Sequence, residues 1–424
     1  MARRTISLPR RYGAFVLTVP ALMAIGPVRG DGTANPAAVP PAPPPAAADI
    51  AARITGDWGG LRPRLAERGL TIGGTALLDV SRNLTGGLRS NLTAVRDLIH
   101  IHLALDTRKA FALPGGTFYL DFASHNGTNG TADLVGDAQG FDNQDAPRFN
   151  QVYEVWYQQK LLGDTFRLKA GKMDANSEFA VQEYGREFLG STMAYSTTIS
   201  AMPTYPNPAP GAEVFFKADN HFDLGGGVFY DNGQQATFIF TGRPQETQSI
   251  VGGVFLIGEA GYHWALPGGD LHGHVTIGGW GHTGDFPRLS GGLDHGAQGF
   301  YGFVDQCLCR VQGIDGQVCG LGAFLQGGLS DGAVSPMAAH IGGGVSATGL
   351  IPGRPNDVQG IGANWVQFGD QPNLPYSYEL SVEAFYKLQL TPWLSAKPDV
   401  QYIRHPGGTF SDAVVLTLRM QMNF

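Results

Sequence analysis

The last twelve residues, 413–424, read Ala-Val-Val-Leu-Thr-Leu-Arg-Met-Gln-Met-Asn-Phe. In an extended chain successive side chains point to opposite faces. One face of this segment therefore carries Val414, Leu416, Leu418, Met420, Met422 and Phe424, and the other carries Ala413, Val415, Thr417, Arg419, Gln421 and Asn423. An apolar face that closes on a terminal aromatic residue is typical of the last strand of a transmembrane β-barrel. The sequence therefore predicts an all-β fold, a transmembrane antiparallel barrel, and the commonest function of such a barrel is a pore.

The same alternation recurs upstream, in residues 98–105 and 380–390. A barrel strand that crosses hydrocarbon needs about nine to eleven residues, which is longer than most strands of soluble sandwiches. Allowing roughly 22 residues per strand and connection, residues 70–424 hold about sixteen strands, enough for a water-filled interior. Stretches rich in Gly, Asn, Asp and Pro predict long loops at 124–148, 185–210, 284–298 and 352–376.

The N-terminal part has a different character. Residues 1–30 start with a basic region and continue into a short apolar run, Phe15 to Ile25, as a signal peptide does. Residues 31–53 form a Pro/Ala-rich linker, and residues 54–69 predict a short helix that Gly69 ends. The barrel then occupies residues 70–424. An export signal without later apolar helices favours the outer membrane of a bacterium.

Charge and cysteines exclude several classes of protein. Without the five arginines of residues 1–30, 24 basic residues face 36 acidic ones, which argues against nucleic acid as a partner. Three cysteines cannot all pair within one chain, so either a Cys309–Cys319 or a Cys307–Cys319 disulfide is expected. No metal site is predicted from them, since a fourth ligand is missing. No cofactor is implied.

Several ordered motifs resemble the carbohydrate-selective porins of the OprB family. They are Gly56-Asp57-Trp58-Gly59-Gly60, Ala170-Gly171-Lys172-Met173-Asp174-Ala175-Asn176, Tyr205-Pro206-Asn207-Pro208, Gly349-Leu350-Ile351-Pro352-Gly353-Arg354 with Asp357, Tyr378-Glu379-Leu380, and Leu390-Thr391-Pro392-Trp393-Leu394 running into Pro398-Asp399-Val400-Gln401-Tyr402. The resemblance covers roughly residues 54–424 and implies a sixteen-stranded outer-membrane barrel that passes mono- or oligosaccharides by diffusion. Outer-membrane lipid, the barrel assembly machinery acting through Phe424, and further copies of the chain are the other expected partners.

Polar side chains on the inner face of such a barrel are candidates for lining the pore, because a charge that faces hydrocarbon is costly. The candidates in strands are Glu154, Trp156, Arg167, Lys169, Glu379, Glu383, Lys387, Lys397, Asp399, Gln401 and Arg419. Lys172, Asp174, Asn176, Arg354 and Asp357 lie in loops or at strand ends, where they either shape a constriction or hold the loops. Asp57, Trp58 and Arg62 either sit at the pore mouth or plug the N-terminus against the wall.

Other readings remain open. Gly328-Leu329-Ser330-Asp331-Gly332 matches the string of a nucleophile elbow, which would suit an outer-membrane barrel hydrolase, although no helix is expected after it. A general diffusion pore without sugar preference shares every barrel feature. His272 and His274 share one strand face with His263 nearby, which could hold a metal but fits lumen histidines better.

Overall fold

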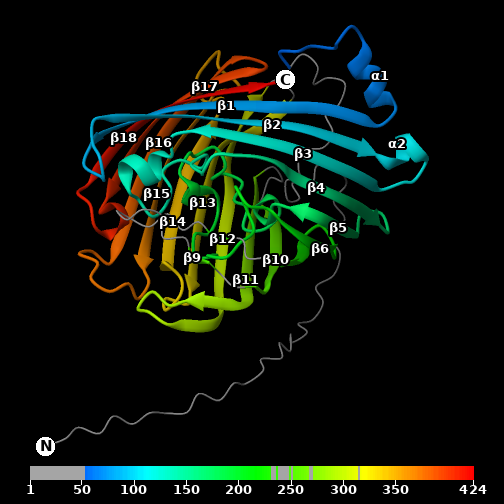
Figure 1. The fold of residues 1–424 in the computed structure, drawn as a ribbon. Helices are drawn as coiled ribbons and strands as arrows, with labels where there is room; N and C mark the ends of the chain where they lie inside the picture. The colour runs from blue at the N-terminus through cyan, green and yellow to red at the C-terminus, as the bar shows by residue number, and fades with distance from the viewer. Residues whose placement is uncertain (1–52, 231–234, 237–247, 250–251, 267–270, 314–315) are drawn as a thin grey trace, which may run out of the picture. The chain divides into compact units, whose positions relative to one another are not determined.

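The computed structural model describes residues 53–230, 235–236, 248–249, 252–266, 271–313 and 316–424. The predicted signal peptide and all of the Pro/Ala linker except residue 53 lie outside the described residues. Sixteen antiparallel strands close into one barrel, in the order β1-β18-β17-β16-β15-β14-β13-β12-β11-β10-β7-β6-β5-β4-β3-β2 (Figure 1). The predicted fold class and strand number are confirmed. No helix among the described residues is long and apolar enough to cross a bilayer.

The wall strands all run next to their sequence neighbours, and β1 closes the ring against β18. Their bounds are β1 Leu70–Thr85, β2 Leu92–Asp106, β3 Gly116–Gly127, β4 Phe149–Leu161, β5 Phe166–Met173, β6 Ala209–Lys217, β7 Phe222–Tyr230, β10 Val254–Ala265, β11 His272–Pro287, β12 Leu293–Gly313, β13 Gly316–Ser330, β14 Met337–Thr348, β15 Val358–Phe368, β16 Tyr378–Thr391, β17 Leu394–Arg404 and β18 Ala413–Asn423. A separate pair, β8 Gln235–Ala236 and β9 Gln248–Ser249, lies between β7 and β10 in sequence.

The terminal strand behaves as its alternation predicts. Leu416 and Leu418 face outward and are exposed, whereas Thr417 and Arg419 face the lumen and are buried. Asp79 of β1 is the direct partner of Arg419 in the register that closes the barrel. The outward face is apolar because it meets lipid, and the inward face keeps the polar groups.

The two ends of the barrel differ. One end, called the turn end here, carries short connections such as 162–165, 218–221 and 392–393, together with helix α1 (Leu61–Glu67), α2 (Thr107–Phe111) and the C-terminus (Figure 1). The other end, the loop end, carries the long connections 128–148 and 174–208. Gly69, at a φ of 90°, follows α1 as the sequence predicts.

Two of the four predicted long loops are wrong. Residues 284–298 are largely strand, because β11 and β12 remain paired there, with Asp285 opposite His295. Residues 352–376 contain β15. Glycines made this segment look like a loop, but Gly360 is needed in the strand because a Cβ there would meet the rings of Phe385 and Phe188 at 2.6 and 3.0 Å.

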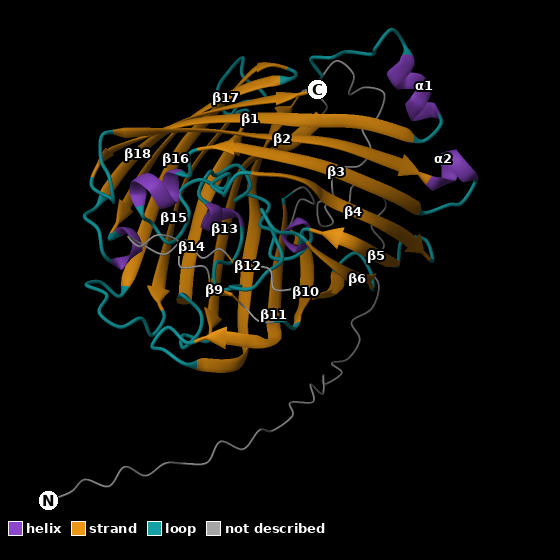
Figure 2. Ribbon diagram, viewed as in Figure 1, coloured by secondary structure: helices purple, strands orange, loops and turns teal. Residues whose placement is uncertain are grey.

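The two long connections fold back into the barrel. Loop A, residues 128–148, contains the π-helical turn η2 (Thr131–Val135). Loop B, residues 174–208, contains the short helices η3 (Ala175–Ser177) and α3 (Ser191–Ala194). Figure 2 shows loop segments and short helices inside the ring of strands. The last short helix, η4 (Pro406–Gly408), lies in the connection between β17 and β18.

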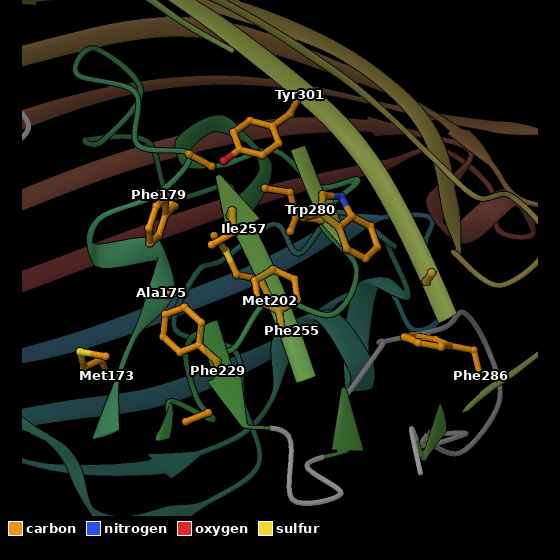
Figure 3. Close-up of a cluster of buried hydrophobic side chains, with 14 of the residues drawn as sticks. Met173, Ala175, Phe179, Met202, Phe229, Phe255, Ile257, Trp280, Phe286 and Tyr301 are labelled. Atoms are coloured by element: carbon orange, nitrogen blue, oxygen red, sulfur yellow. The ribbon is translucent and has the colours of Figure 1, made fainter. Parts of the chain in front are cut away.

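An apolar cluster inside the barrel holds loop B against one side of the wall. Phe179 and Met202 of loop B are buried against side chains of β7, β10, β11 and β12. Figure 3 shows the wall residues of this cluster, which include Phe229, Phe255, Ile257, Trp280 and Tyr301. Burying aromatic side chains of this size contributes about 1.5–3 kcal/mol each, so the cluster fixes where loop B lies in the lumen.

Candidate pore constriction

Loops A and B contact each other within the barrel. The Ser191 N–H donates to the Gly140 carbonyl at 2.9 Å, and the Asn143 N–H donates to the Leu189 carbonyl at 2.8 Å. Thr192 Oγ1 donates to Gln139 Oε1 at 3.0 Å. The two loops therefore form one layer across the lumen, and this layer narrows the passage.

Loop A is held by buried charges of the wall. Arg419 Nη2 lies 2.7 Å from Asp79 Oδ2 on β1 and 2.9 Å from Asp142 Oδ1 on loop A. Arg96 of β2 also pairs with Asp142, and its Nε lies 2.8 Å from Asp145 Oδ1. All of these side chains are buried, so each charge depends on its partner.

Two glutamates of β16 hold the backbone of both loops. Glu379 accepts hydrogen bonds from the N–H groups of Ala138 at 2.8 Å and Gln139 at 3.1 Å, both on loop A. Glu383 accepts from the N–H of Gly190, on loop B, at 2.9 Å. Charge-assisted bonds to backbone N–H groups are stronger than neutral ones. β16 is therefore the strand on which the two loops converge.

Lysines and an arginine complete the attachment of loop B. Lys387 Nζ and Lys397 Nζ each lie 2.7 Å from a different carboxylate oxygen of Glu187. Arg167 Nη2 and Lys169 Nζ lie 2.7 and 3.1 Å from the oxygens of Glu178. Burial alone would raise the pKa of Glu187, but Lys397 and Lys387 outweigh it and lower this pKa to about 2. These ion pairs therefore persist to low pH.

The structure places the predicted strand candidates on the inner face, where most of them hold loops and have little contact with solvent. This describes Arg167, Lys169, Glu379, Glu383, Lys397 and Arg419 as given above, and Asp399 and Gln401, which lie beside the loop A carbonyl of Phe141. Glu154 accepts from the Asp174 N–H at 3.0 Å. The ring of Trp156 stacks on Tyr119 at 4.7 Å, and Lys169 lies 4.6 Å from its centroid. Trp156 is buried, so its ring is not free to stack on a sugar.

Lys172 is a correction to the list of pore-lining candidates. It pairs with Val155, an exposed residue of the lipid-facing surface, in the register of β4 and β5. Its Nζ donates to the Val152 carbonyl at 2.6 Å and to Gln151 Oε1 at 3.0 Å. Its stem covers apolar surface while the ammonium reaches polar groups near the strand end. Lys172 therefore faces outward and does not line the lumen.

The remaining loop candidates hold local structure. Asp174 accepts from the Asn176 N–H at 2.9 Å at the start of loop B. Arg354 Nε donates to Asp357 at 2.7 Å, and Tyr386 OH donates to the same carboxylate at 2.6 Å, in the turn-end connection between β14 and β15. This pair lies at the opposite end from the loops, so it does not shape the constriction.

The N-terminal motif also folds on itself. The guanidinium of Arg62 lies 4.1 Å from the ring centroid of Trp58, and its Nη1 donates to the Gly56 carbonyl at 2.7 Å. Asp57 accepts from the Gly59 N–H at 3.0 Å. These contacts order the segment before α1.

The disulfide joins Cys307 to Cys319, with 5.8 Å between their Cα atoms, and Cys309 is a free, exposed thiol. The expected alternative Cys309–Cys319 is therefore wrong. The register of β12 and β13 shifts on both sides of Cys309. This bulge turns Cys309 to the surface, while Cys307 stays buried.

Ser330 does not form a hydrolase site with the groups around it. It ends β13, and a turn leads from it into β14, so the strand–turn–helix of a nucleophile elbow is missing here. Its Oγ is hydrogen-bonded to Ser335, and no described histidine bonds to it.

Loop B leaves a short charged segment open to the passage. Arg186 is exposed, and Glu183 and Glu187 on either side of it keep about a third of their side-chain surface exposed. Glu183, Arg186 and Glu187 were missed from the sequence, as were Asp79, Arg96, Asp142, Glu178 and Asp305 on the wall and loops. For the loop residues the available signal was the presence of charges within long connections, and for Asp79, Arg96 and Asp305 it was their place on the inner face of the strands β1, β2 and β12.

A closed sixteen-stranded barrel with an apolar outer face, and a lumen narrowed by inward loops, defines the class of outer-membrane porins. A family model described as carbohydrate-selective porin, OprB family, matches residues 97–424, and the chain belongs to this family. The protein is thus a carbohydrate porin of a bacterial outer membrane. The loop end faces the outside and the turn end faces the periplasm, as in other barrels of this kind.

Individual relatives agree. Porin B of Pseudomonas aeruginosa is 25% identical over 429 residues, which cover 87% of this chain and 90% of that protein. The high pH structure of Pseudomonas putida OprB superimposes with a TM-score of 0.75 at 20% identity, covering 88% of this chain and 99% of that one. The low pH structure of the same protein gives a TM-score of 0.58 at 18% identity, covering 88% and 98%. At sequence identities of 20% and 18%, the two structures support the fold alone.

Proposed function

We propose that sugars cross the barrel past the charged segment 183–187 of loop B, and that its exposed residue Arg186 is the main polar contact for their hydroxyl groups. The observation that carries this is the contrast in burial. The wall charges are closed off by the loops they hold, whereas Arg186 is exposed between two half-open glutamates. A guanidinium and carboxylates side by side offer donors and acceptors to a hydroxyl-rich solute.

Passage is by diffusion, without a catalytic step. Mono- or oligosaccharides are the proposed solutes, and weak binding lets them leave. The alternative function is a general diffusion pore without sugar preference, because such a pore needs only the same water-filled passage through the barrel. Glu383 and Arg419 are buried and hold the loops, so changing either of them would alter the width of the pore as well as its chemistry. Arg186 is therefore the residue that tests the chemistry of the pore separately from its width.

Arg186→Gln is expected to slow glucose entry about three- to tenfold in a liposome swelling assay, because one charged donor group is lost. An amino acid of similar size should enter at an unchanged rate. Lys160→Gln, in which an exposed lysine near the turn end paired with Asp164 is changed, is the control. Equal changes for the sugar and the amino acid would show that Arg186 only sets width, and would favour the general pore.

The remaining partners are also proposals. The apolar outer face fits lipid. Phe424, which directly follows β18, exchanges backbone hydrogen bonds with Gly74 of β1 at 2.9 and 3.0 Å. We expect removal of Phe424 to lower the yield of folded barrel in the membrane several-fold, as judged by heat-modifiable migration, if assembly factors recognise this residue. Unchanged yield would contradict that role. Whether copies associate is measured by size-exclusion chromatography with light scattering.

A further inference from the structure

Three lumen-facing histidines lie on the periplasmic side of loop B, and each has a carboxylate partner. His263 Nε2 bonds Asp223, His272 Nε2 lies 3.3 Å from Glu183 Oε1, and His274 Nε2 lies 3.5 Å from Asp305 Oδ2. They come from the ends of β10 and β11 nearest the turn end. We call His263, His272, His274 and Asp223 the exit cluster.

The exit cluster is open to solutes, unlike the loop anchors. The side chains of His263, His272 and His274 are 24%, 21% and 16% exposed, and Asp223 is 43% exposed. The anchor Glu383 is fully buried. A molecule that has passed the constriction can therefore reach these imidazoles, but it cannot reach the anchors.

The cluster joins the constriction directly. Glu183, the partner of His272, belongs to the charged segment 183–187 of loop B, and the neighbouring Tyr184 OH lies 3.3 Å from the same imidazole nitrogen. Glu183 and Tyr184 therefore connect the segment that carries Arg186 with the exit cluster. Several successive contacts with a sugar suit conduction, because each of them can be weak enough for the sugar to leave.

The geometry suits a pyranose. His263 and His274 are direct cross-strand partners, and their rings stack with centroids 5.4 Å apart at an interplanar angle of 25°. Phe303 meets the ring of His274 edge-on at 5.6 Å. Flat ring surface can cover apolar C–H groups, while imidazole nitrogens and the Asp223 carboxylate at its border can bond hydroxyls.

Metal binding is the other use of histidines. No group of three His, Cys, Asp or Glu side chains within the described part of the chain is spaced to hold a metal ion. Each imidazole also already faces a carboxylate at hydrogen-bond or ion-pair distance. The observations therefore favour a neutral, hydroxyl-rich ligand.

We propose that the exit cluster is a second, weak sugar-binding subsite on the periplasmic side of the constriction. The proposal rests on the proposed function, because it assumes that sugars travel past segment 183–187. It adds a site that acts after the constriction. Sugars entering from the periplasmic side meet it first.

The test is sugar-induced current noise of single channels in a planar bilayer, with glucose added to the periplasmic side. The double variant His263→Ala/His274→Ala is expected to raise the half-saturating glucose concentration about three- to tenfold, with little change in conductance without sugar. Asp223→Asn, which keeps the size of the side chain, should show a smaller change in the same direction. His295→Ala is the matched control, because His295 also pairs with an aspartate, Asp285, but is 89% exposed at the loop end.

Unchanged noise in the double variant and in Asp223→Asn, while Arg186→Gln still impairs glucose entry, would overturn the exit subsite and leave the proposed function standing. Absence of sugar-induced current noise in the wild-type channel would contradict both the exit subsite and the proposed function. A block of the wild type by Zn²⁺ that the double variant abolishes, without any change in glucose binding, would identify the cluster as a metal site and would also overturn the proposal.

Discussion

Arg419→Leu is expected to leave a sixteen-stranded barrel whose loop A is no longer held in the lumen. Arg419 bonds Asp79 on β1 and Asp142 and Asn143 on loop A, at 2.7–3.0 Å. Without the guanidinium, two buried carboxylates lose a counter-charge. Breaking a buried pair in this way costs about 3–5 kcal/mol. The cheapest relief is for Asp142 to move into water, which takes loop A away from the wall.

The measurement is liposome swelling with a series of oligosaccharides, beside single-channel conductance. We expect the conductance to rise and the largest sugar that enters to increase, because loop A is half of the layer that narrows the passage. Arg82→Leu is the control, since Arg82 is exposed on the outer face of β1, where it donates to Thr93 Oγ1 at 3.2 Å. Adding Asp79→Asn to Arg419→Leu should restore part of the docking, because it removes one uncompensated buried charge and leaves the pair of Arg96 and Asp142 intact. A variant with the wild-type size limit would show that loop A is held by its other contacts.

The barrel fold could be predicted from the sequence because lipid imposes a simple rule on each strand. A charge on the outer face is costly, so the phase of strands such as β16 and β18 follows from the alternation of their residues. The rule fails where the strand is rich in glycine. β15 was mistaken for a loop because Gly360 and Gly362 have no side chain to show a phase, and the rings that fill their space come from Phe188 and Phe385.

The pore constriction could be predicted from the sequence only in part, for a different reason. Glu383 could be placed in the lumen from its own strand, but its partners, the N–H groups of Leu189 and Gly190, are 194 and 193 residues away and belong to the backbone. Nothing in the side-chain pattern of loop B announces such a bond. Hence the wall charges were found as candidates for contacting sugar, whereas most of them hold the loops. The exposed Arg186 could not be singled out, because its exposure depends on how loop B docks.

Register irregularities were also invisible. The bulge around Cys309 decides which cysteine pairs with Cys319, and it arises from the two strands together. Lys172 shows a related limit. Its charge suggested the lumen, yet the side chain lies on the outer phase and its ammonium bonds the end of the neighbouring strand.

Asp137 makes loop A the part of the constriction that responds to pH. Its side chain is 1% exposed, and among the described residues only the backbone N–H groups of Phe141 and of Asp137 itself contribute hydrogen bonds to its carboxylate. The next two residues donate their N–H groups to Glu379. Burial in the first place, and then the carboxyls of Glu379 and Asp145, raise the pKa of Asp137 well above its usual range. In the docked loop Asp137 therefore holds a proton.

The sign of the effect follows from this raised pKa. The docked loop binds a proton that the undocked loop releases, so docking is fully stable below the ordinary carboxyl pKa and weakens as pH rises through the raised value. Loop B should not respond in the same range, because Glu187 stays ionised from a pKa of about 2 upward. Conductance of the wild type is therefore expected to increase as pH rises above the ordinary carboxyl range, because loop A then loosens.

Asp137→Asn should abolish this rise, because the amide cannot ionise. At the alkaline end, the variant should be more stable to urea by about 1–3 kcal/mol, because the wild type must then either bury a carboxylate charge or release loop A. Asp133→Asn is the control, since Asp133 lies on the same loop but is about half exposed, 3.7 Å from Arg89. Single-channel conductance over the pH series decides the matter. A rise that persists in Asp137→Asn would place the titrating group elsewhere, and a wild type without any rise would mean that the other anchors hold loop A even when Asp137 is charged.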